Sequence, residues 1–135
     1  MDTKYTLKLI DIRCNSARKL GGDTISILIA GQKMWVNPDI QFHPQHIHYV
    51  NFEDGSIRTK DGAEAILRPA LTCPSIQVDS LPAVLKLETR TFLKFSETIG
   101  RVIITPICTQ SKVVHQRIVM DGADYCISYA LLCNS

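Results

Sequence analysis

Three histidines lie close together in the sequence and could bind a metal ion. They form an H-x-x-H-x-H pattern made by His43, His46 and His48. Because side chains alternate along a strand, His46 and His48 would point to the same face, about 7 Å apart. Two imidazoles on one face can chelate Zn²⁺ or Cu²⁺ when a third ligand converges, here His43 or a distant cysteine. The alternative interpretation is a solvated strand face that is rich in histidine.

A polar segment late in the chain mixes cations with aromatic rings. Its candidate binding residues are Arg90, Phe92, Lys94 and Phe95. Such a loop could insert its rings into a membrane interface while its cations contact anionic headgroups, or it could contact a protein partner. The two phenylalanines could equally fold back and close the end of a β-sandwich.

Two further cations, Arg18 and Lys19, are candidate binding residues in an earlier loop that contains Gly21-Gly22. Together with Arg13 and Arg101 they could lie near the polar and aromatic loop and enlarge a basic patch. The lone tryptophan, Trp35, follows a glycine turn. It is either a core residue or a ring that stacks on a sugar, and the second interpretation gives a lectin-like, carbohydrate-binding protein as an alternative function.

The sequence shows no recognisable local catalytic or cofactor-binding motif. It has no G-x-S-x-G, no phosphate-binding glycine loop, no H-E-x-x-H and no dinucleotide fingerprint. We therefore expect no cofactor and favour a protein that is not an enzyme. A small β-fold enzyme remains an alternative, with a pocket assembled from distant residues such as His115 and a cysteine.

Composition indicates a globular chain. Its 135 residues are 45% hydrophobic and 21% charged, with a formal net charge of +2. This length suits one domain spanning residues 1–135. The near balance of charge makes nucleic acid an unlikely partner, because phosphate binding usually needs a concentrated excess of Lys and Arg.

Cysteine usage and the N-terminus predict a cytoplasmic location. The five cysteines are scattered, and an odd number cannot pair fully within one chain. Reduced thiols are typical of a reducing compartment. The first residues carry no apolar signal region, and the best apolar stretch, Ile25 to Ala30, has only the length of a strand.

Hydrophobic residues alternate with polar ones almost throughout, which predicts β-strands. The apolar phase switches after Leu9, as a β-bulge would cause. Gly31-Gln32 predicts a type II′ hairpin turn, and Asp121-Gly122 predicts a hairpin between the last two strands. Residues 63–67 predict a helical turn or a loop. The fold class is therefore all-β, an antiparallel sandwich of about eight strands.

Three segments resemble C2 domains. Residues 23–35 read DTISILIAGQKMW, residues 84–88 read VLKLE and residues 95–101 read FSETIGR. Their order and spacing are similar to strands of that family, so the resemblance implies a C2-like sandwich. Members that bind phospholipid through Ca²⁺ carry clustered aspartates in loops at one end, whereas here the first loop offers Asp23 alone and residues 89–94 read TRTFLK.

The resemblance therefore implies a calcium-independent variant. Hard cations need several carboxylates among six to eight oxygen ligands, and these loops do not supply them. The function that we expect is a non-catalytic module that contacts a protein partner or a membrane surface through loops at one end. A homo-oligomer is also possible, because long apolar strands need cover on their edges and faces.

Overall fold

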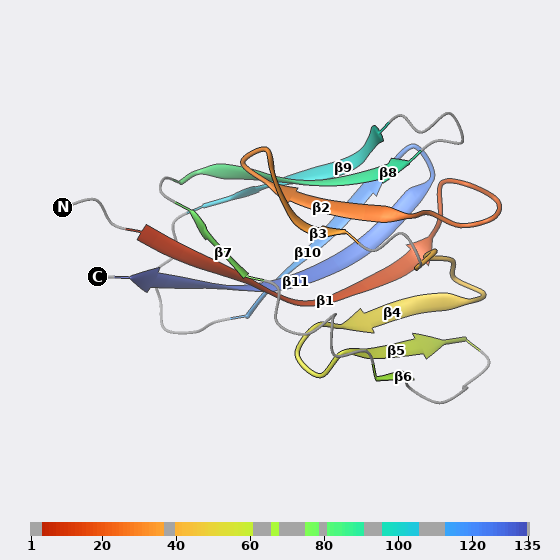
Figure 1. The fold of residues 1–135 in the computed structure, drawn as a ribbon. Helices are drawn as coiled ribbons and strands as arrows, with labels where there is room; N and C mark the ends of the chain where they lie inside the picture. The colour runs from red at the N-terminus through yellow and green to blue at the C-terminus, as the bar shows by residue number, and fades with distance from the viewer. Residues whose placement is uncertain are drawn as a thin grey trace.

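The computed structural model confirms the predicted antiparallel β-sandwich (Figure 1). It describes residues 4–36, 40–60, 66–67, 75–78, 81–90, 96–105 and 113–134. No helix in these ranges is long and apolar enough to cross a bilayer. The strands are β1 (Lys4–Ser16), β2 (Ile25–Ile29), β3 (Gln32–Val36), β4 (Ile47–Asn51), β5 (Ser56–Thr59), β6 (Ile66–Leu67), β7 (Ser75–Val78), β8 (Ala83–Arg90), β9 (Ser96–Ile104), β10 (Val113–Met120) and β11 (Ala123–Asn134).

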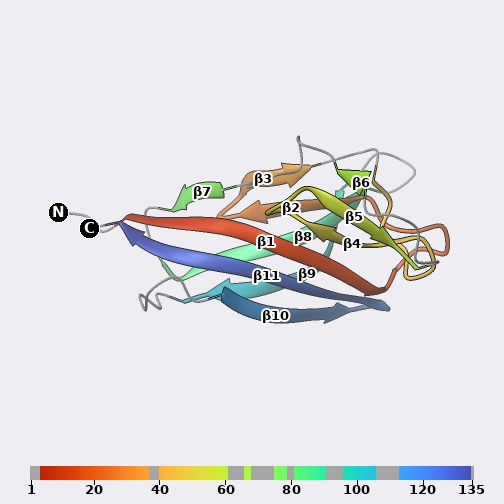
Figure 2. The same cartoon turned by 90° about the horizontal axis from the view of Figure 1, so that it is seen from below.

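The strands form two layers. The larger sheet has the order β10-β11-β1-β4-β5-β6. β7 and β4 pair with the same edge of β1, β7 with its first half and β4 with its second half. The smaller sheet has the order β3-β2-β8-β9. Figure 2 shows the long strands β1 and β11 side by side in front of the smaller sheet. The helical turn or loop predicted for residues 63–67 is wrong at its end, because Ile66 and Leu67 form β6 and pair with β5.

The predicted β-bulge lies in β1. Its register with β11 shifts between Leu9 and Asp11, so Ile10 is the extra residue. Before the bulge Leu7 and Leu9 point into the core, and after it Ile12 and Cys14 do so. A bulge increases local twist and re-aims side chains, which lets one 13-residue strand cover the whole length of the core.

Both short hairpins close with two residues at positive φ. The Asp121-Gly122 turn is confirmed, with φ of 49° and 89°. The other turn is not the predicted type II′ turn at Gly31-Gln32. Ile29 pairs with Gln32, so the turn residues are Ala30 and Gly31, with φ of 49° and 81°. Positive φ at both positions defines a type I′ turn, whose twist matches that of the strands.

The core lies between the two inner faces and is centred on aromatic rings. Trp35 packs edge-on against Phe42 and Phe52, with ring centroids 6.2 and 5.2 Å apart. Phe42 also meets Tyr125 at 6.1 Å. One face of the last strand is buried, and its residues are Tyr125, Ile127, Tyr129 and Leu131.

Gly100 lies where β9 of the smaller sheet packs closely against β10 of the larger sheet. A Cβ built on Gly100 would overlap Cγ2 of Ile118, on β10 of the larger sheet. Real carbon atoms do not approach so closely, so any side chain here would push β10 and β9 apart. Glycine therefore lets the two sheets pack closely at this edge without strain.

Replacing Gly100 tests this closure. We expect Gly100→Ala to lower the free energy of unfolding by about 1–3 kcal/mol through overpacking, measured by urea denaturation. Gly21→Ala is the matched control, because nothing lies within 4 Å of a Cβ at Gly21, and it should change stability by less than about 0.5 kcal/mol. Equal effects of the two substitutions would contradict the close packing.

Candidate functional site

A row of cations crosses the outer face of the smaller sheet. Lys33 on β3 pairs in register with Leu28 on β2, Leu28 with Lys86 on β8, and Lys86 with Arg101 on β9. Residues in register on neighbouring strands point to the same side of a sheet, and strands lie about 5 Å apart. The three cations therefore form one line roughly 14 Å long, interrupted only by Leu28.

Two cations of this row are unneutralised. Lys33 and Arg101 are exposed, and neither has a carboxylate within salt-bridge distance among the described residues. Lys86 lies 3.7 Å from Glu88, with about a third of its side chain exposed. Glu88 is 17% exposed, so this half-buried pair takes up part of the positive charge of the row, and Lys33 and Arg101 carry the charges that have no described carboxylate partner.

Apolar surface adjoins the cations. Two residues along the strands from Lys86 and Arg101, Val84 pairs with Ile103. Val84 and Ile103 are 40% and 61% exposed. A shallow hollow of about 500 Å³ lies beside them. Its lining residues are Ala30, Gly31, Pro82, Ala83, Val84, Lys86 and Arg101. The face thus combines cations with apolar side chains, as a surface for an amphiphilic ligand would.

The arginines on the outer face of the larger sheet are engaged in contacts within the protein. Tyr49 on β4 lies between Arg13 and Arg58, whose guanidinium carbons are 5.2 and 5.5 Å from its ring centroid. The Tyr49 hydroxyl donates a hydrogen bond to Asp11 at 3.1 Å. Burial, then the charge of Asp11, raises the pKa of Tyr49, so the hydroxyl keeps the proton that it donates to Asp11.

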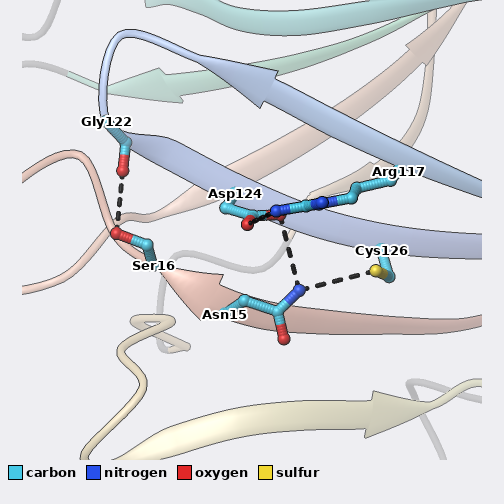
Figure 3. A network of polar contacts seen from close by, with 6 residues as sticks. All are labelled: Asn15, Ser16, Arg117, Gly122, Asp124 and Cys126. Carbon is cyan, nitrogen blue, oxygen red and sulfur yellow. Dashed lines mark hydrogen bonds and ion pairs between the residues drawn. The ribbon is translucent and has the colours of Figure 1, made fainter.

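Arg117 on β10 is also paired. Its guanidinium donates two hydrogen bonds to Asp124, at 3.1 and 2.6 Å (Figure 3). Asn15 contacts the same carboxylate at 3.4 Å, and Ser16 donates to the carbonyl of Gly122 at 2.8 Å. The hydrogen bond from Arg117 lowers the pKa of Asp124. This network joins the end of β1 to β10 and β11 near the Asp121-Gly122 turn.

Asp23, the one aspartate of the first loop, faces inward. It is fully buried and accepts hydrogen bonds from the backbone N–H groups of Arg18 and Lys19, at 2.8 and 3.2 Å, and from the Tyr125 hydroxyl at 2.7 Å. Burial, followed by the hydrogen bond to Asp23, raises the pKa of Tyr125 well above its usual value. Burial also raises the pKa of neighbouring Cys14 to about 11.

The predicted histidine cluster is spread over a turn and a strand. His43 and His46 precede β4, with ring centroids 5.1 Å apart, and His48 lies on β4 at a register irregularity. No three of the described His, Cys, Asp and Glu residues gather in a way that could hold a metal ion. A metal site at His43, His46 and His48 stays a prediction.

The predicted loop site lies mostly outside the described residues. Phe92, Lys94 and Phe95 belong to that part of the chain, and only the backbone of Arg90, paired with Ser96, is described. Their role in binding stays a prediction.

The structure separates the predicted basic patch. Arg18 forms an ion pair with Glu97 at 2.5 Å, and Lys19 lies half-buried beside it. The remaining two members lie on opposite faces of the sandwich, Arg13 on the larger sheet and Arg101 on the smaller. The grouping of Arg13 with Arg101 is therefore wrong, because Arg101 lies on β9 at the end of the smaller sheet, whereas Arg13 lies on β1 in the larger sheet.

Trp35 lies in the core, 7% exposed. Its contacts with Phe42 and Phe52 favour the core interpretation over a sugar-stacking ring. Sequence reasoning missed Lys33 and Lys86 as surface cations of one row. Each stands on the polar side of an alternating strand, which was a usable signal, but the neighbours β3-β2-β8-β9 could not be read from the sequence.

No protein-family model and no curated protein matches this chain. Among solved structures, it is similar to a C2 domain of plant extended synaptotagmin 1, with 10% identity and a TM-score of 0.53, covering 98% of this chain and 95% of that chain. The fold is C2-like. A further structure, described as a C2 domain, is 13% identical over 95% of this chain and 98% of its own, with a TM-score of 0.48.

The raised pKa of Tyr125 predicts a loss of stability in alkali. Below about pH 10 the phenol is neutral in both states; above it, only the unfolded chain ionises, so stability falls by about 1.4 kcal/mol per pH unit. Tyr125→Phe should lose about 1–3 kcal/mol near neutral pH but lack this alkaline fall. Urea unfolding at about pH 8 and about pH 11 compares the two proteins. Parallel pH profiles would contradict this role of Tyr125.

Proposed function

We propose that this protein is a non-catalytic C2-like module that binds an anionic membrane surface through the outer face of its smaller sheet. The observation that carries the proposal is the row Lys33, Lys86 and Arg101, with two cations that have no described carboxylate partner. The C2-like fold supports a binding module but does not choose its ligand.

The arrangement of the cations suits a lipid surface. A line of charges on a sheet face can meet several headgroups at once, and each basic residue near an anionic bilayer contributes about 1 kcal/mol. Lys33 and Arg101, which have no described carboxylate partner, thus give reversible attachment that weakens with salt. Unlike a deep pocket, a sheet face does not select one molecule by enclosing it.

Exposed apolar side chains complement this attraction. Val84 and Ile103 lie two residues along the strands from Lys86 and Arg101. They would therefore reach the headgroup region when the cations contact the lipid phosphates. Burying such side chains adds a hydrophobic contribution of about 25 cal/mol per Å². The mixture of both kinds of residue favours a lipid interface over a purely acidic protein partner.

The attachment that we propose is independent of calcium. In this structure the carboxylate of Asp23 is buried and holds three hydrogen bonds from its own protein. To bind a cation it would have to release the Tyr125 hydroxyl and two backbone N–H groups. The cations of the sheet face instead contact lipid phosphates directly.

Vesicle flotation tests the membrane proposal. We expect binding to vesicles that contain phosphatidylserine in phosphatidylcholine, and little binding to phosphatidylcholine alone. Lys33→Gln/Arg101→Gln should weaken the partition coefficient about thirtyfold, because two contributions of about 1 kcal/mol are lost. High salt should weaken binding of the parent protein in the same way.

The matched control removes the same charge from the other face. Arg13→Gln/Arg58→Gln takes two cations from the larger sheet, where both stack on Tyr49, and should bind vesicles nearly as the parent does. Equal loss in both double variants would show attraction by net charge alone. Negligible binding to anionic vesicles would reject the membrane and leave an acidic protein as the partner.

Calcium removal tests the mode of attachment. We expect equal flotation with phosphatidylserine vesicles in the presence of Ca²⁺ and of a chelator, because no acidic cluster takes part in the contact. Asp23→Asn is the companion variant and should alter stability without creating a calcium effect. Binding that appears only with Ca²⁺ would contradict this mode while leaving membrane binding itself intact.

A further inference from the structure

Strand β10 lies at the end of the larger sheet (Figure 2). Its eight residues pair along their full length with β11 on one side. On the other side, no described strand pairs with it. Its second row of backbone N–H and C=O groups is therefore available for another strand.

The features that usually protect a sheet edge are missing from β10. The strand contains neither proline nor lysine, and its single formal charge, Arg117, is held by Asp124 on β11 through two hydrogen bonds (Figure 3). The guanidinium of Arg117 therefore points toward β11 and not past the free edge of β10. Val113 and Val119 are 38% and 61% exposed. Natural edges of this length usually carry charges, prolines or bulges that prevent pairing.

The hairpin turn determines which backbone groups face outward. Met120 and Ala123 flank the two-residue turn and form the first pair of the ladder. In a two-residue hairpin this pair is hydrogen-bonded, and bonded pairs then alternate along the strands. The N–H and C=O groups that point away from β11 consequently belong to Val113, His115, Arg117 and Val119.

The geometry points to a second copy of this chain as the occupant of the edge, paired antiparallel through β10 about a two-fold axis at Gln116. In this register Val113 opposes Val119 of the other copy, and His115 opposes Arg117. All four outward-facing residues of each copy find a bonded partner, which gives eight intermolecular hydrogen bonds. A shift by two residues would leave some of these groups unpaired.

The side chains agree with this register. The most exposed valine of the strand, Val119, would lie beside Val113 of the other copy, so four partly exposed valines are covered in the dimer. Arg117 keeps its pairing with Asp124, and His115, whose Nδ1 lies 2.7 Å from the Ser128 hydroxyl, opposes it. An isologous contact of this kind closes as a dimer and does not propagate.

A single strand pair buries less surface than the roughly 1,200–2,000 Å² of stable complexes. We therefore expect a reversible dimer with a dissociation constant in the micromolar to millimolar range. Sedimentation equilibrium without lipid measures this directly, and its result is independent of membrane binding. A chain that is monomeric at its highest soluble concentration would overturn the proposal.

Proline at the edge provides the specific variant. His115→Pro removes an N–H group that faces outward and is not used in pairing with β11. Two intermolecular hydrogen bonds are lost by symmetry, so the dimer should weaken at least about tenfold. His115→Ala is the matched control, because it loses the same side chain but keeps the N–H, and it should dimerise like the parent. Equal weakening by both would overturn the proposed pairing.

Amide hydrogen exchange keeps the proposal testable if the proline variant does not fold. In the parent protein, exchange at His115 and Arg117 should slow as concentration rises, since their N–H groups become bonded only in the dimer. Exchange at Gln116 and Ile118, which bond to β11 in the monomer, should depend less on concentration. Identical concentration dependence at all four amides would overturn the register.

Discussion

The sandwich depends on the hydrogen bonds that the buried side chain of Asp23 accepts. Asp23 lies where the chain leaves the larger sheet and enters the smaller one, two residues before β2. Burying an unsatisfied charge is costly, and here two backbone N–H groups and the Tyr125 hydroxyl satisfy it. The backbone of Asp23 also exchanges two hydrogen bonds with Phe42. One residue thus connects the crossover, the last strand and the aromatic core.

Strand register then converts this framework into surfaces. Bonded neighbours in the smaller sheet bring Lys33, Lys86 and Arg101 into one line, although they are far apart in the sequence. The same principle on the larger sheet stacks Arg13 and Arg58 on Tyr49. The two faces differ in what their arginines and lysines contact: Arg13 and Arg58 stack on Tyr49, whereas Lys33 and Arg101 face solvent.

Alternation in the sequence was sufficient for the strands, the bulge at Ile10 and the Asp121-Gly122 turn, because these features are local. The turn at Ala30 was misplaced by one residue, since a type I′ turn places positive φ on a non-glycine residue there. The cationic row was not predictable, because it depends on which strands become neighbours. The orientation of Asp23 likewise depends on Tyr125, 102 residues away.

The position of β10 at the end of the larger sheet has a geometric consequence. Antiparallel strands are related by a two-fold axis perpendicular to their sheet, so two copies joined at β10 would carry their smaller sheets on the same side. Both cationic rows would then point to the same side of the dimer and could contact one membrane surface together. The dimer would stay bound to the membrane when one of its two copies dissociates from the lipid. Avidity of this kind raises apparent affinity without any new contact, so surface density could itself control residence at the bilayer.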